Sequence, residues 1–338
     1  MAAAARKCGQ HGAARPRAGQ FLFAVLAVAV GVVAGSRVAS TENVTSARAA
    51  YITNQLGNSL SVVDLTAGKQ AAEIAIGGKP AGIALSPDGM RAYVAAPESR
   101  EVVAVDTASQ AVVKRAVVGQ GPLGIAVNPQ SGAVYVADWY EHRLYAIDPQ
   151  TLSITASVAT GQSPSGVAVT ADGKTILTAD RDSNQVSLID AATFKVTGTI
   201  ETGERPFGVT MDDTSGRAYT ANVASNSMTV LDVKAGTRLR DIPVGLRPYA
   251  IARAGNLLFV TNQHAESVSV IDATTFDALK TIRVGSFPEG IEADPSGQAV
   301  WVACWDANTL EKIDVETLAV TARITVGEGP RAFGKFLR

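Results

Sequence analysis

The chain has 338 residues, of which 46% are apolar and 18% charged, and its formal net charge is −1. The low charged fraction, with 31 glycines and 14 prolines, favours sheets and turns over helices. A chain this close to neutrality lacks the basic surface of a general double-stranded nucleic-acid binder.

The first 40 residues differ from the rest. Arg6, Lys7, Arg15 and Arg17 precede an apolar run over residues 21–35, and small residues follow it. This order is typical of a secretory signal peptide. The run is short for a transmembrane helix, which needs about 20 residues. We therefore predict a signal peptide over residues 1–40 and an exported, periplasmic or extracellular protein, with an uncleaved membrane anchor as the alternative.

Removal of that segment would change charge and cysteine content. Residues 1–40 carry five of the 30 Lys and Arg residues and none of the 31 Asp and Glu residues, so the remainder has a net charge of −6. Only Cys304 would remain, so no intramolecular disulfide can form. The sequence predicts a short linker over residues 41–49 and one domain over residues 50–338.

That domain consists of a repeat of about 42 residues. Prolines recur at positions 80, 122, 164, 206, 248, 288 and 330. Aspartates recur at positions 64, 106, 148, 190, 232, 272 and 314, each after an apolar strand. Large residues recur as Tyr51, Tyr93, Tyr135, Leu177, Tyr219, Phe259 and Trp301. The spacing changes once, by two residues in the turn around Gly255, where a shorter hairpin leaves both strands in register.

Each repeat contains four short strand patterns, as in 82–85, 92–95, 101–105 and 112–117. Four strands in about 40 residues form one propeller blade. The repeats begin at a second strand, near Tyr51, and end at a first strand over 331–336. We therefore predict an all-β, seven-bladed β-propeller with four-stranded blades. Three N-terminal strands and one C-terminal strand should complete one blade and close the ring.

The repeats resemble a known family. Tyr51-Ile52-Thr53-Asn54, Tyr219-Thr220-Ala221-Asn222 and Phe259-Val260-Thr261-Asn262 are similar to the YVTN repeat of YncE-like seven-bladed propellers. The resemblance covers about residues 50–338. It implies the propeller fold, but relatives include binding proteins, surface-layer proteins, lactonase-like enzymes and dehydrogenase subunits, so it leaves the function open.

Residues that differ between repeats are the candidates for a site. In a propeller, the loops between second and third strands and those between blades surround one mouth of the central channel, so variable side chains there can face a ligand. Candidates beside the repeated prolines are Arg205, Phe207, Arg247, Tyr249, Phe287, Glu289 and Arg331. Candidates in the other loops are Trp139, His142, Arg181, His264 and Trp305. Arginines among aromatic rings suit a planar, anionic ligand, with an ordinary solvated rim as the alternative.

Enzyme and metal signatures are sparse. His264 and Glu289 are weak candidates for an acid–base pair in a lactonase- or lyase-like enzyme. Asp138 and Asp180 are weak candidates for a hard cation. Cys304 could be a reactive thiol or, as a small strand-end residue, part of the core. The sequence predicts no cofactor.

These observations favour a monomeric binding or interaction protein of the cell envelope. Its ligand could be a small molecule, a polyanion such as single-stranded nucleic acid, or a protein. An enzyme at the channel mouth and a surface-layer or assembly component are the alternatives.

Overall fold

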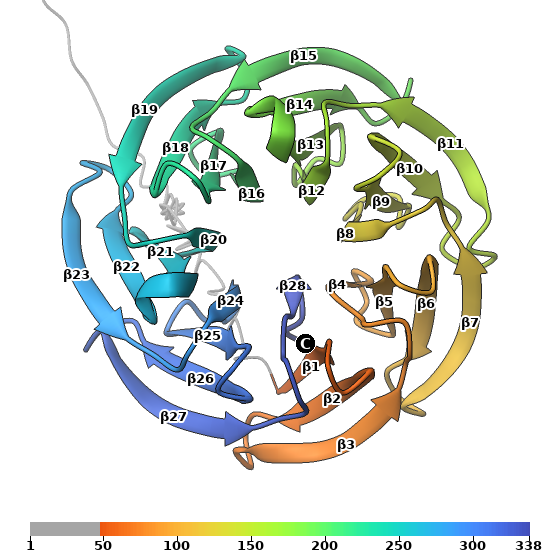
Figure 1. Ribbon diagram of the computed structural model, residues 1–338, viewed down its shortest axis with the longest axis horizontal. Coiled ribbons are helices and arrows are strands. Elements are labelled where there is room, and N and C mark those ends of the chain that lie inside the picture. Colours follow the sequence, from red (N-terminus) through yellow and green to blue (C-terminus); the bar gives the residue numbers. More distant parts are fainter. Residues whose placement is uncertain (1–47) are drawn as a thin grey trace, which may run out of the picture. The chain divides into compact units, whose positions relative to one another are not determined.

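The computed structural model describes residues 48–338, which form seven sheets around a ring (Figure 1). The predicted signal peptide lies outside the described residues. Within those residues, no helix is long and apolar enough to cross a membrane. The predicted all-β, seven-bladed propeller is confirmed.

In each blade the strands follow one another from the channel outward. The first blade contains β1 (Ala49–Asn54), β2 (Ser59–Asp64) and β3 (Lys69–Ala75); the second β4 (Gly82–Leu85), β5 (Arg91–Ala96), β6 (Glu101–Asp106) and β7 (Ala111–Val117); the third β8 (Pro122–Val127), β9 (Val134–Asp138), β10 (Arg143–Ile147) and β11 (Ile154–Ala159). The fourth contains β12 (Pro164–Val169), β13 (Thr175–Asp180), β14 (Gln185–Asp190) and β15 (Lys195–Glu201); the fifth β16 (Pro206–Asp212), β17 (Arg217–Asn222), β18 (Ser227–Asp232) and β19 (Thr237–Pro243). The sixth contains β20 (Pro248–Ala254), β21 (Leu257–Asn262), β22 (Ser267–Asp272) and β23 (Ala278–Arg283); the seventh β24 (Pro288–Ala293), β25 (Ala299–Cys304), β26 (Thr309–Asp314) and β27 (Ala319–Thr325).

The C-terminal segment closes the ring, as predicted. Asn54 bridges Pro330, and Ala50 bridges Leu337, so this segment runs antiparallel to β1 as the innermost strand of the first blade. The bridge at Pro330 matches the pairing of Pro122 with Asp138 in the third blade. The regular ladder is shorter than expected: β28 (Phe333–Gly334) pairs in parallel with β4 of the second blade. The last residues therefore join two blades.

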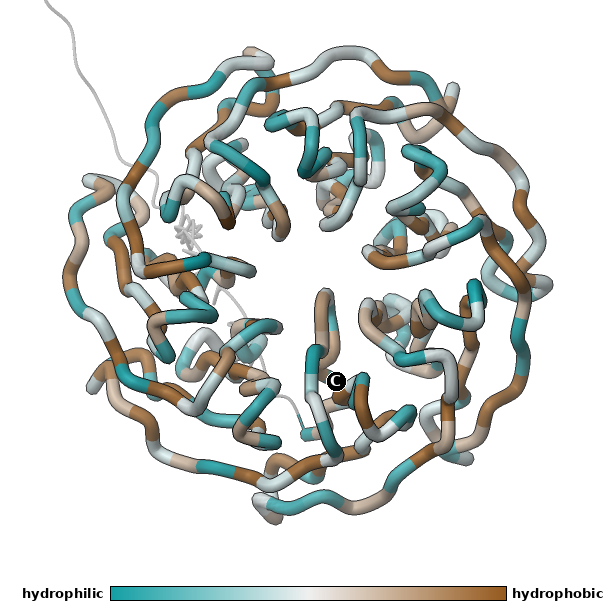
Figure 2. The backbone as a smooth tube through the Cα atoms, viewed as in Figure 1, coloured by the Kyte–Doolittle hydropathy of each residue, from teal (hydrophilic) through white to brown (hydrophobic). Residues whose placement is uncertain are grey.

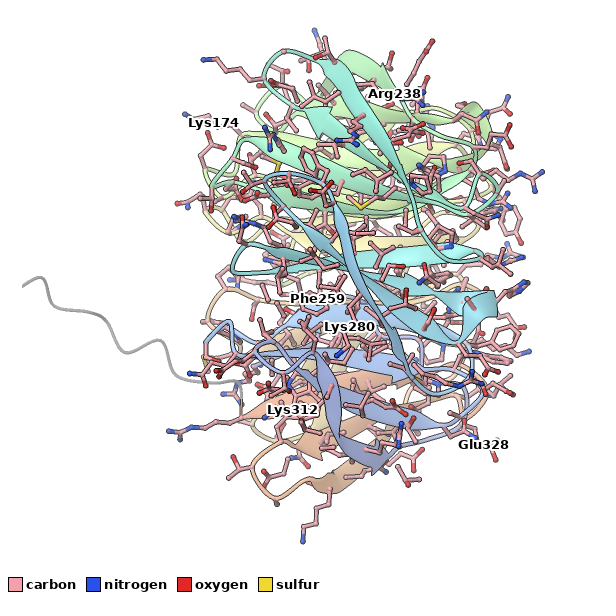
Figure 3. All side chains as sticks on the ribbon, turned by 90° about the vertical axis from the view of Figure 1, so that its left-hand side faces the viewer. Lys174, Arg238, Phe259, Lys280, Lys312 and Glu328 are labelled. Atoms are coloured by element: carbon pink, nitrogen blue, oxygen red, sulfur yellow. The ribbon has the colours of Figure 1, made fainter. Side chains whose placement is uncertain are left out.

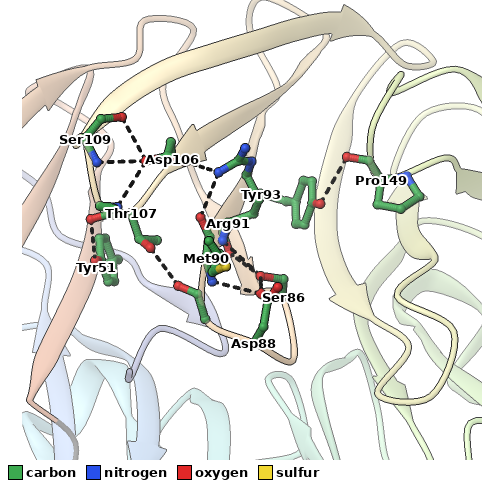
Figure 4. A network of polar contacts seen from close by, with 12 residues as sticks. Tyr51, Ser86, Asp88, Met90, Arg91, Tyr93, Asp106, Thr107, Ser109 and Pro149 are labelled. Carbon is green, nitrogen blue, oxygen red and sulfur yellow. Dashed lines mark hydrogen bonds and ion pairs between the residues drawn. The ribbon is translucent and has the colours of Figure 1, made fainter.

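The repeated large residues are buried and connect neighbouring blades. The side chain of Tyr51 is 1% exposed and that of Tyr93 is 3% exposed. The Tyr51 hydroxyl donates to the carbonyl of Thr107, and the Tyr93 hydroxyl donates to the carbonyl of Pro149, one blade further on (Figure 4). Both carbonyls directly follow a repeated aspartate. These residues are therefore parts of the scaffold.

The repeated aspartates cap turns. In the second blade, Asp106 Oδ1 accepts hydrogen bonds from the backbone N–H groups of Ala108 and Ser109, at 3.1 and 2.7 Å. The hydrogen bonds from Ser109 are the largest cause that lowers the pKa of Asp106, to about 2. The same arrangement at Asp148 and Asp314 confirms that this position specifies a turn.

Neighbouring blades approach closely because most repeats carry glycine two residues after the repeated proline. A Cβ atom added at Gly124 would lie 1.8 Å from the carbonyl oxygen of Ser165 in the next blade. Added at Gly82, it would lie 2.0 Å from the carbonyl oxygen of Leu123. These glycines therefore permit the backbone contact between innermost strands.

The two ends of the blades form two different faces of the ring. Figure 3 shows Glu328, from the loop after β27, on the opposite face from Lys174, from the β12–β13 hairpin. We call the first the loop face, because it carries the loops between second and third strands and those between blades. Apolar residues are interleaved with polar ones around the whole ring (Figure 2).

Two features of the loops concern the sequence prediction. The shortened hairpin joins β20 and β21 through Gly255 and Asn256, and Ala254 pairs with Leu257, so both strands stay in register as predicted. Two single-turn 3-10 helices, η1 (Arg181–Ser183) and η2 (Gln263–Ala265), lie on the loop face and were not predicted.

The ring closure makes stability depend on pH through Glu292. Its Oε2 accepts the backbone N–H groups of Phe336 and Leu337, the latter at 2.8 Å. Burial raises the pKa of Glu292 to about 7 from an ordinary value of 4.5, although the two hydrogen bonds act to lower it. The folded state thus holds the proton more tightly than the unfolded state, and stability is lost as pH rises from about 4.5 to about 7.

We expect Glu292→Gln to remove this pH dependence, because glutamine keeps an acceptor oxygen without a charge. Melting temperatures of the variant and the wild type should be similar at pH 4.5, and the variant should melt higher at pH 8. A difference that is the same at both pH values would contradict this role of Glu292.

Candidate functional site

A cavity of about 450 Å³ opens on the loop face at the channel mouth. We call it the aromatic cavity. Its lining comes from six of the seven blades and consists of Gln55, Trp139, Arg181, Phe207, Val223, Arg247, Tyr249, Gln263, His264, Phe287, Glu289, Trp305 and Arg331. Ten of the twelve sequence-predicted ligand-binding candidates are in this set.

The floor of the cavity is a buried polar cluster. Arg331, from the closing segment, donates from Nε to Glu289 Oε2 at 2.8 Å and from Nη2 to the Tyr249 hydroxyl. The other carboxylate oxygen of Glu289 accepts from Gln263 Nε2 at 2.6 Å. The side chains of Arg331 and Glu289 are 15% and 7% exposed. Three parts of the chain that are distant in sequence therefore form one rigid unit.

The cluster keeps its groups in fixed protonation states. Burial raises the pKa of Tyr249, so the phenol stays neutral. Burial acts to lower the pKa of Arg331, but the adjacent Glu289 carboxylate outweighs it and raises the pKa above its ordinary value. Arg331 thus stays charged, and it pairs with Glu289, so the floor presents little net charge.

Aromatic rings pack together beside this cluster. The ring centroids of Phe207 and Tyr249 are 4.3 Å apart, and both rings contact Phe333, at 5.0 and 5.6 Å. Such contacts fix ring orientation and exclude water. Phe333 also lines a second cavity of about 430 Å³, which is mostly aliphatic and which we call the aliphatic cavity. This aromatic layer therefore lies between the two cavities.

The walls carry aromatic rings and cations. Phe287 lies between His264 and Trp305, with centroid distances of 5.4 and 6.2 Å. Arg181 lies over the ring of Trp139 at 5.3 Å, and its guanidinium also pairs with Asp182 at 2.6 Å. Trp305 Nε1 donates to Gln55 Oε1 at 3.2 Å, which links the seventh blade to the first.

Of the three arginines that line the cavity, Arg247 is the one whose guanidinium has no polar partner in the described residues. Its backbone is left-handed, with φ of 53°, and its N–H donates to Asn226 Oδ1 at 2.8 Å. Across residues 48–338, its guanidinium makes no hydrogen bond or ion pair. A left-handed non-glycine residue costs free energy, and this turn fixes where the side chain leaves the backbone. Arg247 is therefore positioned to bind an anion at the mouth.

The sequence matches one family model, that of the YNCE-like beta-propeller, over residues 126–217. The match runs from β8 to the start of β17, and the seven-bladed ring continues the same repeat. The chain is a YncE-like seven-bladed β-propeller. No curated protein matches its sequence.

Solved structures share the fold of this YncE-like propeller at low identity. Hydrazine synthase from Kuenenia stuttgartiensis is 22% identical, with a TM-score of 0.71 over 82% of this chain and 99% of that chain. A functionally unknown protein from Desulfotomaculum acetoxidans DSM 771 is 15% identical, with a TM-score of 0.72 over 85% and 100%. The dihydro-heme d1 dehydrogenase NirN in complex with DHE is 15% identical, with a TM-score of 0.64 over 84% and 74%. These similarities establish the fold alone.

Two predicted candidates of this YncE-like propeller lie outside the aromatic cavity. His142 Nδ1 accepts the backbone N–H of Ser163 at 2.9 Å. Asparagines at the same repeat position accept the equivalent N–H, as Asn184 does from Arg205 at 2.8 Å. His142 therefore replaces a turn-forming asparagine. Arg205 is exposed on the rim, with its Nε 3.9 Å from Asp182, and it does not line the cavity.

The weak metal candidates are engaged within their own blades. Asp138 accepts four backbone N–H groups, from Gln120, Gly121, Tyr140 and Glu141. Asp180 accepts from Thr178, Ser187 and Gln185 and from the N–H of Gly161; burial is the main cause that raises its pKa. Among residues 48–338, no three His, Cys, Asp or Glu side chains form a group that could hold a metal ion.

Cys304 is a core residue of this YncE-like propeller. It is fully buried at the end of β25, and burial raises the pKa of its thiol. A neutral, inaccessible thiol is a poor nucleophile.

Three lining residues, Gln55, Val223 and Gln263, were not among the predicted ligand-binding candidates. They share one repeat position with Trp139, Arg181 and Trp305, directly after the end of each second strand. Six of the seven residues at this position line the cavity, so the repeat itself contained the signal. Phe333, whose ring contacts Phe207 and Tyr249, was not a candidate because it is neither beside a repeated proline nor in a loop after a second strand.

Proposed function

We propose that this propeller is an exported, non-catalytic binding protein that recognises a planar, anionic group in the aromatic cavity. The observation that carries the proposal is the combination of an unpaired Arg247 with the rings of Phe287, Trp305 and Trp139 in one cavity. Aromatic faces favour a flat ligand, and an arginine fork favours a carboxylate or phosphate. The predicted signal peptide supports a location in the periplasm or outside the cell.

The charge of the lining supports an anion. Three arginines and one glutamate line the cavity, which gives a formal charge of +2 with His264 neutral. Because Glu289 is paired with Arg331, no free carboxylate is left in the lining to attract a cation. A cation-binding aromatic cage therefore fits less well than an anion site.

The enzyme alternative has less support. Both carboxylate oxygens of Glu289 are occupied, by Gln263 and Arg331, so this group is not free to accept a proton from a ligand. His264 is exposed and contacts Phe287 instead. The two residues thus lack the arrangement that an acid–base pair needs. We retain binding as the proposed function.

The test compares two arginines at one repeat position. Arg247→Ala should weaken the binding of 2-naphthoate about 10- to 100-fold, because a hydrogen bond to a charged group contributes about 1.5–3 kcal/mol. Arg205→Ala, outside the cavity, should change it less than about twofold. Isothermal titration calorimetry measures both, with 2-naphthamide as the uncharged control. Equal affinities for the two variants, or for naphthoate and naphthamide, would refute the proposal.

A further inference from the structure

The rim of the aromatic cavity carries large apolar side chains that a ligand inside the cavity would leave uncovered. Leu56 is 47% exposed, Tyr140 is 68% exposed and Leu246 is 57% exposed. Each adjoins a lining residue in sequence, namely Gln55, Trp139 and Arg247. Leu56 and Tyr140 lie in loops of the first and third blades, and Leu246 lies in the loop between the fifth and sixth blades, so they are distributed around the mouth. Contacts that surround an anchor pocket and exclude water are typical of a protein-binding surface.

The charge of the rim argues against a polyanion. Outside the cavity lining, the loops of this face carry three cations, Lys79, Arg100 and Arg205. The same loops carry seven acidic residues: Glu98, Glu141, Asp182, Glu204, Glu266, Asp306 and Glu328. This gives the rim a formal charge of −4 around a cavity lining of +2. A nucleic acid would place phosphates against the acidic rim, which is unfavourable.

A protein segment can complement both the positively charged cavity lining and the acidic rim. An acidic side chain would enter the cavity and meet Arg247, while basic flanking residues face the acidic rim. Leu56, Tyr140 and Leu246 would then pack against the apolar parts of the segment. Interfaces commonly place an anchoring side chain in a desolvated pocket and surround it with contacts that exclude water.

We propose that the loop face binds a protein partner, through a segment that inserts an acidic side chain into the aromatic cavity and carries basic flanks. This inference rests on the proposed function, because it assigns the anionic group to a protein. It adds the requirement that the rim residues Leu56, Tyr140 and Leu246 contribute to binding. Binding of a free small ligand would not need them.

The test uses a phage-displayed library of random dodecapeptides with the full-length protein as bait. A matched bait carries Leu56→Ser, Tyr140→Ser and Leu246→Ser, which change exposed side chains only. Peptides selected on the wild type should contain an acidic residue between lysines or arginines. They should bind the triple variant more than tenfold more weakly, while 2-naphthoate binds both proteins within twofold.

Three results would overturn the inference. These are no enrichment of peptides on the wild type over the triple variant, equal binding of the selected peptides to both proteins, and tighter binding of oligothymidylate than of the peptides at physiological salt. The small-ligand proposal fails separately, if 2-naphthoate does not bind the wild type. Rim-dependent peptide binding would support the partner surface even then.

Discussion

Replacement of Arg331 by methionine is expected to lower the free energy of unfolding by about 3–5 kcal/mol. This is the usual cost of removing one partner of a buried ion pair, since the other charge stays buried without compensation. Glu289 would keep only the contact with Gln263, and the Tyr249 hydroxyl would lose its donor. Because Arg331 belongs to the closing segment, the ring should also open more easily. Chemical denaturation measures the loss.

The double variant Glu289→Gln with Arg331→Met is the matched control. It removes both charges and keeps an acceptor for Gln263, so most of the lost stability should return. Both variants should bind 2-naphthoate more weakly, because both lose the ordered floor beneath the rings. If the single and double variants are equally stable, the ion pair is not what holds the closing segment.

Replacement of Gly124 by alanine should cost about 3 kcal/mol, at the upper end of the range for overpacking. The new Cβ would lie 1.8 Å from the carbonyl oxygen of Ser165, and a backbone oxygen in a sheet cannot rotate away. Neighbouring blades would have to separate. Chemical denaturation of the variant and the wild type measures the cost.

Gly198→Ala is the control for this substitution. It lies in β15, its φ is not in the left-handed region, and an added Cβ would meet no atom within 4 Å. Alanine is favoured over glycine within a strand, so stability should stay the same or rise by up to about 1 kcal/mol. Equal losses at Gly124 and Gly198 would contradict the role of the innermost strands in blade packing.

The fold could be predicted from the sequence because the repeat specifies each blade independently. Asp106 and its equivalents define turns through local hydrogen bonds, which depend only on nearby residues. Tyr51 and Gly124 define contacts between blades that recur once per repeat. Ring closure could be predicted because the repeat begins at a second strand and ends at a first strand. The short ladder of β28 could not be predicted, because the ends of the closing segment pair with β1 while its centre pairs with β4.

The site was less predictable because side-chain direction depends on tertiary contacts. Arg205 and Arg247 occupy the same repeat position with the same turn, yet only Arg247 lines the cavity. Most of the lining comes from blades five to seven, where Phe207, Tyr249 and Glu289 follow the repeated prolines. His142 looked like a functional histidine, but comparison with Asn184 in the next repeat identifies a turn residue.

We expect the aromatic cavity, and not the aliphatic cavity that Phe333 lines, to bind a planar anion. A crystal structure of the protein with 6-bromo-2-naphthoate tests it most directly, because the anomalous signal of bromine locates the ligand. We predict a single bromine peak in the aromatic cavity, with the carboxylate within hydrogen-bond distance of the Arg247 guanidinium and the rings against Phe287 or Trp305. A peak in the aliphatic cavity, or a carboxylate directed away from Arg247, would contradict the account.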